Sequence, residues 1–111
     1  MRLNWVPVFT LAFCLVCLDL AVIVPVVGAQ TKAEVAIADF KFAPEAQTAA
    51  PGATVTWTNK DPAAHMIKFD DQASTALANG ASYSRTFDQP GEYAYRCGIH
   101  SYITGKIVVK K

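Results

Sequence analysis

The sequence has little excess charge of either sign, and cysteine and histidine are scarce. Its 111 residues carry a formal net charge of +1 and include three cysteines and two histidines. A near-neutral chain has no broad basic surface to hold a polyanion, so we expect no nucleic-acid partner. The length allows one small domain.

A long apolar run stands at the start of the chain. Arg2 is followed by an almost continuous apolar stretch over residues 5–27, which ends in Val27-Gly28-Ala29. This pattern is typical of a secretory signal peptide, so we predict cleavage after Ala29 and a periplasmic or otherwise exported domain of residues 30–111. A retained membrane anchor is the alternative, because about 20 apolar residues can span a bilayer. Only in that case would the protein contact a membrane.

Removal of residues 1–29 would leave one cysteine. Cys14 and Cys17 lie in the apolar segment, so the mature domain would keep Cys97 alone. No internal disulfide could form, and an unpaired cysteine in an exported protein indicates a free thiol, an intermolecular bridge or a metal ligand. A domain of about 80 residues has a marginal core, so a bound metal would add useful stability.

No long window of the mature chain has a helical period. Alternating or strand-like stretches occupy residues 33–40, 53–59, 65–70, 82–87, 91–97 and 105–110. Turn residues such as Pro51-Gly52 and Pro90-Gly91 separate them. This spacing predicts an all-β fold, an antiparallel sandwich or barrel of two sheets, with Val55 and Trp57 facing inward. The polar residues 70–80 are expected to cross from one sheet to the other.

The candidate functional residues are Cys97 and both histidines. His65 opens a predicted strand, Cys97 ends another, and His100 follows in the next loop. Strand ends and loops can meet at one end of a sandwich. Two imidazoles and one thiolate are the ligands of a trigonal copper site, in which a weak axial group adjusts the reduction potential.

Several stretches together resemble the cupredoxins, especially the amicyanin and plastocyanin-like type. They are VAIADFKFAPEAQTAAPGATVTWTNKD at 35–61, followed by His65, then GEYAYRCGIH at 91–100 and GKIVVK at 105–110. The resemblance covers nearly all of the mature chain. It implies a Greek-key β-sandwich, one type 1 copper per chain held by His65, Cys97 and His100, and electron transfer without substrate turnover.

The resemblance also implies an axial methionine three residues after His100, where this chain has Ile103. Isoleucine cannot bind a metal, so Ile103 would only pack above a three-coordinate copper. Two other axial groups are Met66, which strand alternation turns away from His65, and the main-chain carbonyl of Ala64. Loss of the thioether predicts a raised reduction potential.

Met66 is a second departure from the family pattern. Many relatives have Asn, Thr or Ser directly after the first histidine, where the side chain links the ligand loops. That link is absent here. The main-chain N–H of Met66 could still bond the Cys97 sulfur.

The same resemblance predicts how a partner would dock. Electrons would pass through the edge of His100, with Ile99, Ser101 and Tyr102 forming an apolar patch on a monomeric protein. The donor and acceptor are not specified. A periplasmic copper-delivery or copper-resistance protein is the alternative function, because Cu(I) accepts three ligands.

Other classes of protein fit the residues less well. An immunoglobulin-like module usually needs two bridged cysteines with a Trp between them. A thiol enzyme would need a residue to orient its histidine base, and the segment 97–103 offers no obvious one. A catalytic zinc would need a nearby general base, and Glu92 is expected to be distant. The sequence therefore predicts an electron carrier and not an enzyme.

Overall fold

The computed structural model describes residues 31–111, and every regular element in this range is a β-strand. The strands are β1 (Lys32–Ala38), β2 (Lys41–Ala43), β3 (Ala46–Ala49), β4 (Ala53–Asn59), β5 (Ile67–Lys68), β6 (Ser82–Phe87), β7 (Gly91–Cys97) and β8 (Thr104–Val109). The predicted signal peptide, residues 1–29, lies outside the described residues. Across residues 31–111 no helix has the length and apolar character to cross a membrane.

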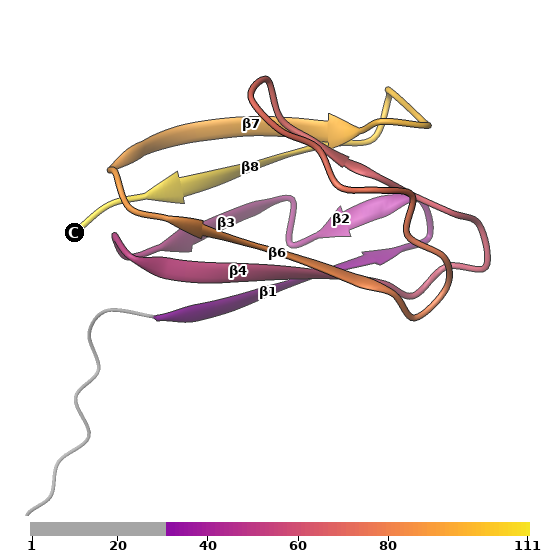
Figure 1. The fold of residues 1–111 in the computed structure, drawn as a ribbon, viewed down its shortest axis with the longest axis horizontal. Coiled ribbons are helices and arrows are strands. Elements are labelled where there is room, and N and C mark those ends of the chain that lie inside the picture. Colours follow the sequence, from indigo (N-terminus) through magenta and orange to yellow (C-terminus); the bar gives the residue numbers. More distant parts are fainter. Residues whose placement is uncertain (1–30) are drawn as a thin grey trace, which may run out of the picture.

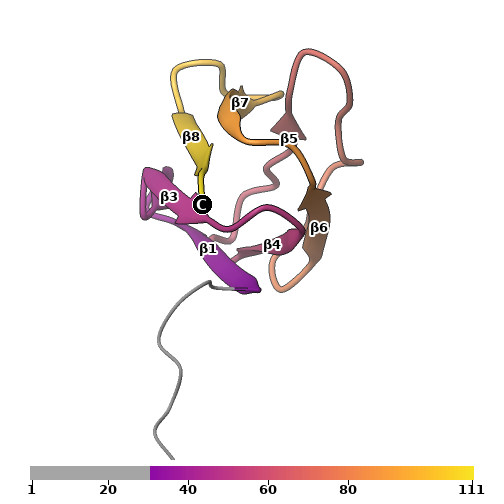
Figure 2. The same cartoon turned by 90° about the vertical axis from the view of Figure 1, so that its left-hand side faces the viewer.

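The strands form two four-stranded sheets that face each other as a sandwich (Figures 1 and 2). One sheet has the order β2-β1-β4-β6 and the other β3-β8-β7-β5. The predicted all-β sandwich is confirmed. In detail the sheets are mixed, because β1 pairs with β4 and β3 with β8 in parallel, whereas the other pairings are antiparallel.

The alternation in β1 and β4 produces the core between the sheets. Val55 and Trp57 are buried, as predicted, and they lie with Val35 and Ile37 of β1. The outward threonines of β4 instead pair their hydroxyls with β6. These cross-strand pairs are Thr54–Thr86 at 2.8 Å, Thr56–Ser84 at 2.8 Å and Thr58–Ser82 at 2.9 Å. Each β4 side chain therefore has a partner suited to its face.

The strand predicted over residues 65–70 is mostly loop, and only β5 within it pairs with β7. His65 instead forms an isolated bridge with Leu77. The Ile67 N–H donates to Ser74 Oγ at 2.9 Å, and the Phe69 N–H donates to the carbonyl of Gln72 at 2.8 Å. The N–H groups of Ile67 and Phe69 are thus bonded to the segment 72–77, so they are not available to extend the strand pairing. That segment then leads from β5 to β6, which lies in the other sheet as expected.

The first predicted strand, residues 33–40, is also shortened at its end. Asp39 and Phe40 have φ angles of 53° and 56°, in the left-handed region, so β1 stops at Ala38. The chain turns there into β2, which the sequence did not predict because three residues beside Pro44 are too few to show a period. This turn lies at the same end of the sandwich as the loop that follows β7 (Figure 1).

Candidate metal centre

Three segments deliver the three predicted ligand residues to one end of the sandwich. His65 lies between β4 and β5, Cys97 is the last residue of β7, and His100 lies in the loop before β8. The bridge between His65 and Leu77 and the pairing of Cys97 with Ile67 fix two of the three main-chain positions. His65 and Cys97 are fully buried, whereas His100 is half-buried.

The side chains of these residues converge as the sequence predicted. One donor atom from each lies within 4.8 Å of the other two. The Cys97 Sγ is 3.7 Å from Nδ1 of His65 and 3.7 Å from Nδ1 of His100. Metal–nitrogen and metal–sulfur bonds of about 2.0 and 2.3 Å, meeting at about 120°, separate their donor atoms by about 3.7 Å. The three side chains therefore fit a trigonal metal ion of the copper or zinc size.

Two main-chain N–H groups point at the sulfur. Met66 and His100 each donate to Cys97 Sγ at 3.4 Å. The bond from Met66 confirms the expectation that its main-chain N–H bonds the Cys97 sulfur. Hydrogen bonds to a ligand sulfur withdraw electron density from it and raise the reduction potential of a copper–thiolate pair.

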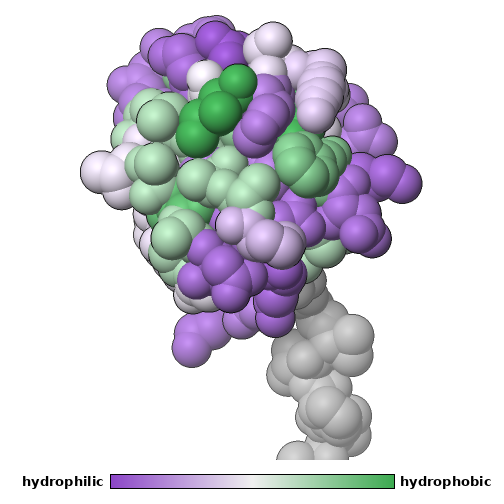
Figure 3. Space-filling model, turned by 90° about the vertical axis from the view of Figure 1, so that its right-hand side faces the viewer, coloured by the Kyte–Doolittle hydropathy of each residue, from purple (hydrophilic) through white to green (hydrophobic). Residues whose placement is uncertain are grey.

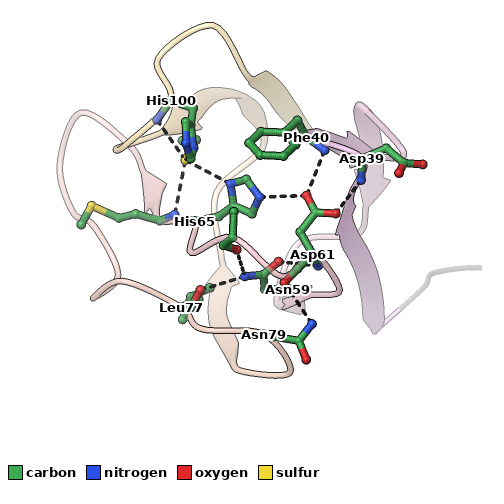
Figure 4. Close-up of polar contacts among 11 residues, drawn as sticks. Asp39, Phe40, Asn59, Asp61, His65, Leu77, Asn79 and His100 are labelled. Carbon is green, nitrogen blue, oxygen red and sulfur yellow. Dashed lines mark hydrogen bonds and ion pairs between the residues drawn. The ribbon is translucent and has the colours of Figure 1, made fainter.

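Asp61 lies beside the first predicted ligand, and the sequence analysis did not single it out. Its Oδ2 lies 2.9 Å from Nε2 of His65, the ring nitrogen that faces away from the sulfur. Asp61 is 6% exposed, and its carboxylate also accepts the main-chain N–H groups of Asp39 and Phe40 (Figure 4). The N–H of Phe40 is the main reason that the pKa of Asp61 is lowered, and the bond to His65 adds to it, while burial opposes the shift.

Asn59, also missed from the sequence, holds the Asp61 turn in place from inside the core. It is fully buried, and its Oδ1 accepts the Asp61 N–H at 2.8 Å. Its amide donates to the carbonyls of Ala63 and Leu77, both at 2.8 Å. Because all its polar atoms are used, Asn59 ties the segment before His65 to the segment that pairs with His65. The sequence offered one sign of this arrangement, namely an aspartate, Asp61, four residues before the candidate ligand His65.

Phe40 lies over both histidines. Its ring centroid is 5.1 Å from that of His65 and 5.2 Å from that of His100, with edge-on angles of 83° and 76°. Phe40 is 42% exposed, Ile99 is 48% exposed and Tyr102 is 66% exposed. This end of the molecule shows apolar surface flanked by hydrophilic surface (Figure 3). The predicted patch around His100 is therefore exposed, and Phe40 extends it.

Ile103 is buried at 4% exposure, and its main chain closes the loop that contains His100. Its N–H donates to the carbonyl of His100 at 3.0 Å, and its carbonyl accepts the Cys97 N–H at 2.9 Å. These bonds hold the loop through the main chain, so they do not depend on which side chain stands at this position. Because position 103 is not a methionine, no side chain here can serve as the axial ligand. The two other axial groups considered, Met66 and the main-chain carbonyl of Ala64, stay predictions.

Comparison with known proteins finds relatives by sequence. A family model for the cupredoxin-like domain matches residues 7–109. Amicyanin-alpha of Methylorubrum extorquens is 38% identical over 85 residues, which are 69% of this chain and 71% of that protein. Chloroplastic plastocyanin of Tetradesmus obliquus is 36% identical over 84 residues, which are 62% of this chain and 58% of that protein.

Solved structures show the same fold. The reduced Cu(I) form of an amicyanin variant superposes with a TM-score of 0.67 at 30% identity, covering 75% of this chain and 86% of that one. A purple cupredoxin from Nitrosopumilus maritimus gives a TM-score of 0.66 at 26% identity, covering 70% of this chain and 99% of that one. Sequence and structure thus identify relatives of the same type.

Proposed function

This chain belongs to the cupredoxin-like family, and we propose that it is an exported type 1 copper protein that carries single electrons between redox partner proteins. His65, Cys97 and His100 are the proposed ligands. The observation that carries this proposal is the group of two imidazoles and one thiol, in which one donor atom from each residue lies within 4.8 Å of the other two. The Cys97 Sγ lies 3.7 Å from Nδ1 of each histidine. Copper bound there would supply one-electron chemistry, because thiolate suits Cu(I) and imidazole suits both oxidation states.

The residues around this group restrict its movement. His65 is fixed by Asp61 on its far side, Cys97 by two N–H groups at its sulfur, and the loop of His100 by the main chain of Ile103. A site held from several directions changes shape little when one electron is added or removed. Small reorganisation is what a fast electron carrier needs.

The exposed end of the molecule is the proposed docking surface. Phe40, Ile99 and Tyr102 expose apolar area beside the half-buried His100, with Ser101 between the last two. Weak redox encounters bury less than about 1,200 Å², so a small patch is sufficient. We propose that a redox partner binds here and that electrons pass through His100, with no substrate turned over by this monomeric protein.

Export is part of the proposal and rests on the sequence of residues 1–29, with cleavage after Ala29. A secreted fraction with Gln30 at its N-terminus would support it, and retention of the full chain in the membrane fraction would contradict the cleavage.

Optical absorption and EPR spectra of the copper-loaded protein test the metal centre. We expect an intense blue, green or purple colour that reductant bleaches, because charge transfer from thiolate to Cu(II) absorbs visible light. A protein that remains colourless with stoichiometric Cu(II), or that takes up zinc with equal preference and no colour, would contradict the proposal.

Copper delivery is the second candidate function, and the absence of an axial methionine at Ile103 favours it, since Cu(I) accepts three ligands. Electron self-exchange and copper transfer to a chelating acceptor separate the two functions. Fast, reversible self-exchange with slow metal release supports the electron carrier. Ready release of Cu(I) without self-exchange supports delivery.

A further inference from the structure

We propose that Asp61 is a positioning residue of the metal centre: its carboxylate fixes the tautomer of His65 and, through the Asp39–Phe40 turn, holds the Phe40 ring over both histidines. This inference rests on the proposed copper site, but its first test does not need the metal.

The carboxylate of Asp61 receives three hydrogen bonds. The Asp39 N–H reaches Oδ1 at 2.7 Å, the Phe40 N–H reaches Oδ2 at 2.9 Å, and His65 Nε2 reaches Oδ2 at 2.9 Å. Asp61 is 6% exposed and His65 is fully buried, so water does not compete strongly for these groups. Among the described residues, His65 is the one cationic or potentially cationic side chain that pairs with this carboxylate.

The bond to His65 determines which ring nitrogen carries the proton. A carboxylate only accepts hydrogen bonds, so Nε2 must donate to it. The lone pair of Nδ1 is then free on the side that faces Cys97 Sγ at 3.7 Å. A ligand histidine that donates its other N–H to a carboxylate is also a stronger base, and this favours the more highly charged metal ion. Asp61 would thus lower the reduction potential, whereas the lack of a thioether at Ile103 is predicted to raise it.

The other two bonds hold an unfavourable turn. Asp39 and Phe40 have φ angles of 53° and 56°, a region that residues other than glycine seldom adopt without local support. Both of their N–H groups end on Asp61, and this turn carries the ring that packs edge-on against His65 and His100. Figure 4 shows the carboxylate between the His65 ring and the turn. One side chain therefore joins a ligand to the aromatic group that covers it.

The first test is the tautomer of His65 in the metal-free protein. A long-range ¹H–¹⁵N NMR spectrum in mildly alkaline buffer, where histidine is ordinarily neutral, should show His65 protonated at Nε2 with slow exchange. A parent protein whose His65 carries its proton on Nδ1 would overturn the inference, whether or not any variant folds. This result is independent of electron transfer.

The second test compares Asp61→Asn with Asp39→Asn as a matched control. Both variants remove one carboxylate from the hydrogen-bonded pair of Asp39 and Asp61, but Asp39 is exposed and contributes only its main-chain N–H. In Asp61→Asn one amide oxygen must serve three donors. We expect its Cu(II) affinity to fall about 10- to 100-fold, its reduction potential to rise, and the amide proton of Asp39 or Phe40 to exchange faster.

The control should change Cu(II) affinity less than threefold and leave the tautomer and amide exchange as in the parent, because an exposed charge is screened by solvent. A folded Asp61→Asn protein with parental Cu(II) affinity, tautomer and amide exchange would overturn the inference. Equal effects in both variants would overturn it as well, since they would indicate general charge and not positioning. Failure of the parent to bind copper would instead count against the proposed function.

Discussion

Replacement of Ile103 by methionine tests the main departure of this chain from its relatives. The Ile103 side chain is buried, whereas its hydrogen bonds to His100 and Cys97 use only main-chain atoms. Ile103→Met therefore changes the group offered to the site and leaves the bonds of the loop intact. We expect the variant to fold like the parent and to differ in its reduction potential.

The size of each effect follows from the burial and the donor chemistry. A swap between apolar side chains of similar volume in a packed site costs less than about 1.5 kcal/mol. A thioether donates to Cu(II) and stabilises it, so the reduction potential should fall. Each tenfold change in the relative stability of the two oxidation states shifts a one-electron potential by about 59 mV. A tenfold preference for Cu(II) would thus lower the potential by about 60 mV.

Spectroelectrochemical titration of the copper-loaded proteins measures this shift, with the urea midpoint of each as the check on folding. Ile103→Leu is the matched control, because it alters the shape of the side chain without adding sulfur, and its potential should stay near that of the parent. A potential that rises in Ile103→Met, or that falls equally in Ile103→Leu, would refute the reasoning.

Three further predictions concern the sulfur ligand and the core. Cys97→Ser should lose the visible charge-transfer band and bind Cu(I) more weakly, because the hydroxyl oxygen of serine is a harder donor than sulfur. Absorption spectra and competition with a Cu(I) chelator measure the two effects. Burial raises the pKa of Tyr95 from 10.0 to about 12, with the Trp57 indole opposing the shift. The folded state therefore keeps a proton that the unfolded state releases, and stability should fall as the pH rises from about 10 to 12, by up to about 3 kcal/mol. Urea midpoints measured across this pH range for the parent and for Tyr95→Phe, which lacks this loss, test it, and equal pH slopes would contradict it. In Gly105→Ala the new Cβ would lie 2.7 Å from the Tyr95 ring and 3.1 Å from the Glu45 carbonyl, so we expect a loss of about 1–3 kcal/mol by urea unfolding, and an unchanged midpoint would show that the sheet yields there.

The strongest predictions from sequence came from patterns that act locally. The two-residue period of β4 placed Val55 and Trp57 in the core, because successive side chains of a strand point to opposite faces. The scarcity of soft and imidazole donors singled out His65, Cys97 and His100, and the structure brings these three together. Whether they bind copper stays a prediction.

The sequence by itself determined the two-sheet β character and the three donor side chains. Alternation is visible within each strand, and the ability of a side chain to bind a metal depends only on its residue type. Only the tertiary structure decided what surrounds the donors. Asp61 meets the main chain of Asp39 and Phe40 across 21 to 22 residues, and Asn59 reaches the carbonyl of Leu77 across 18. Such contacts depend on how two sheets stack and where their loops end, which no local pattern records. The left-handed turn at Asp39 and Phe40 could not be predicted for the same reason, because the carboxylate that supports it belongs to Asp61, in the segment between β4 and β5.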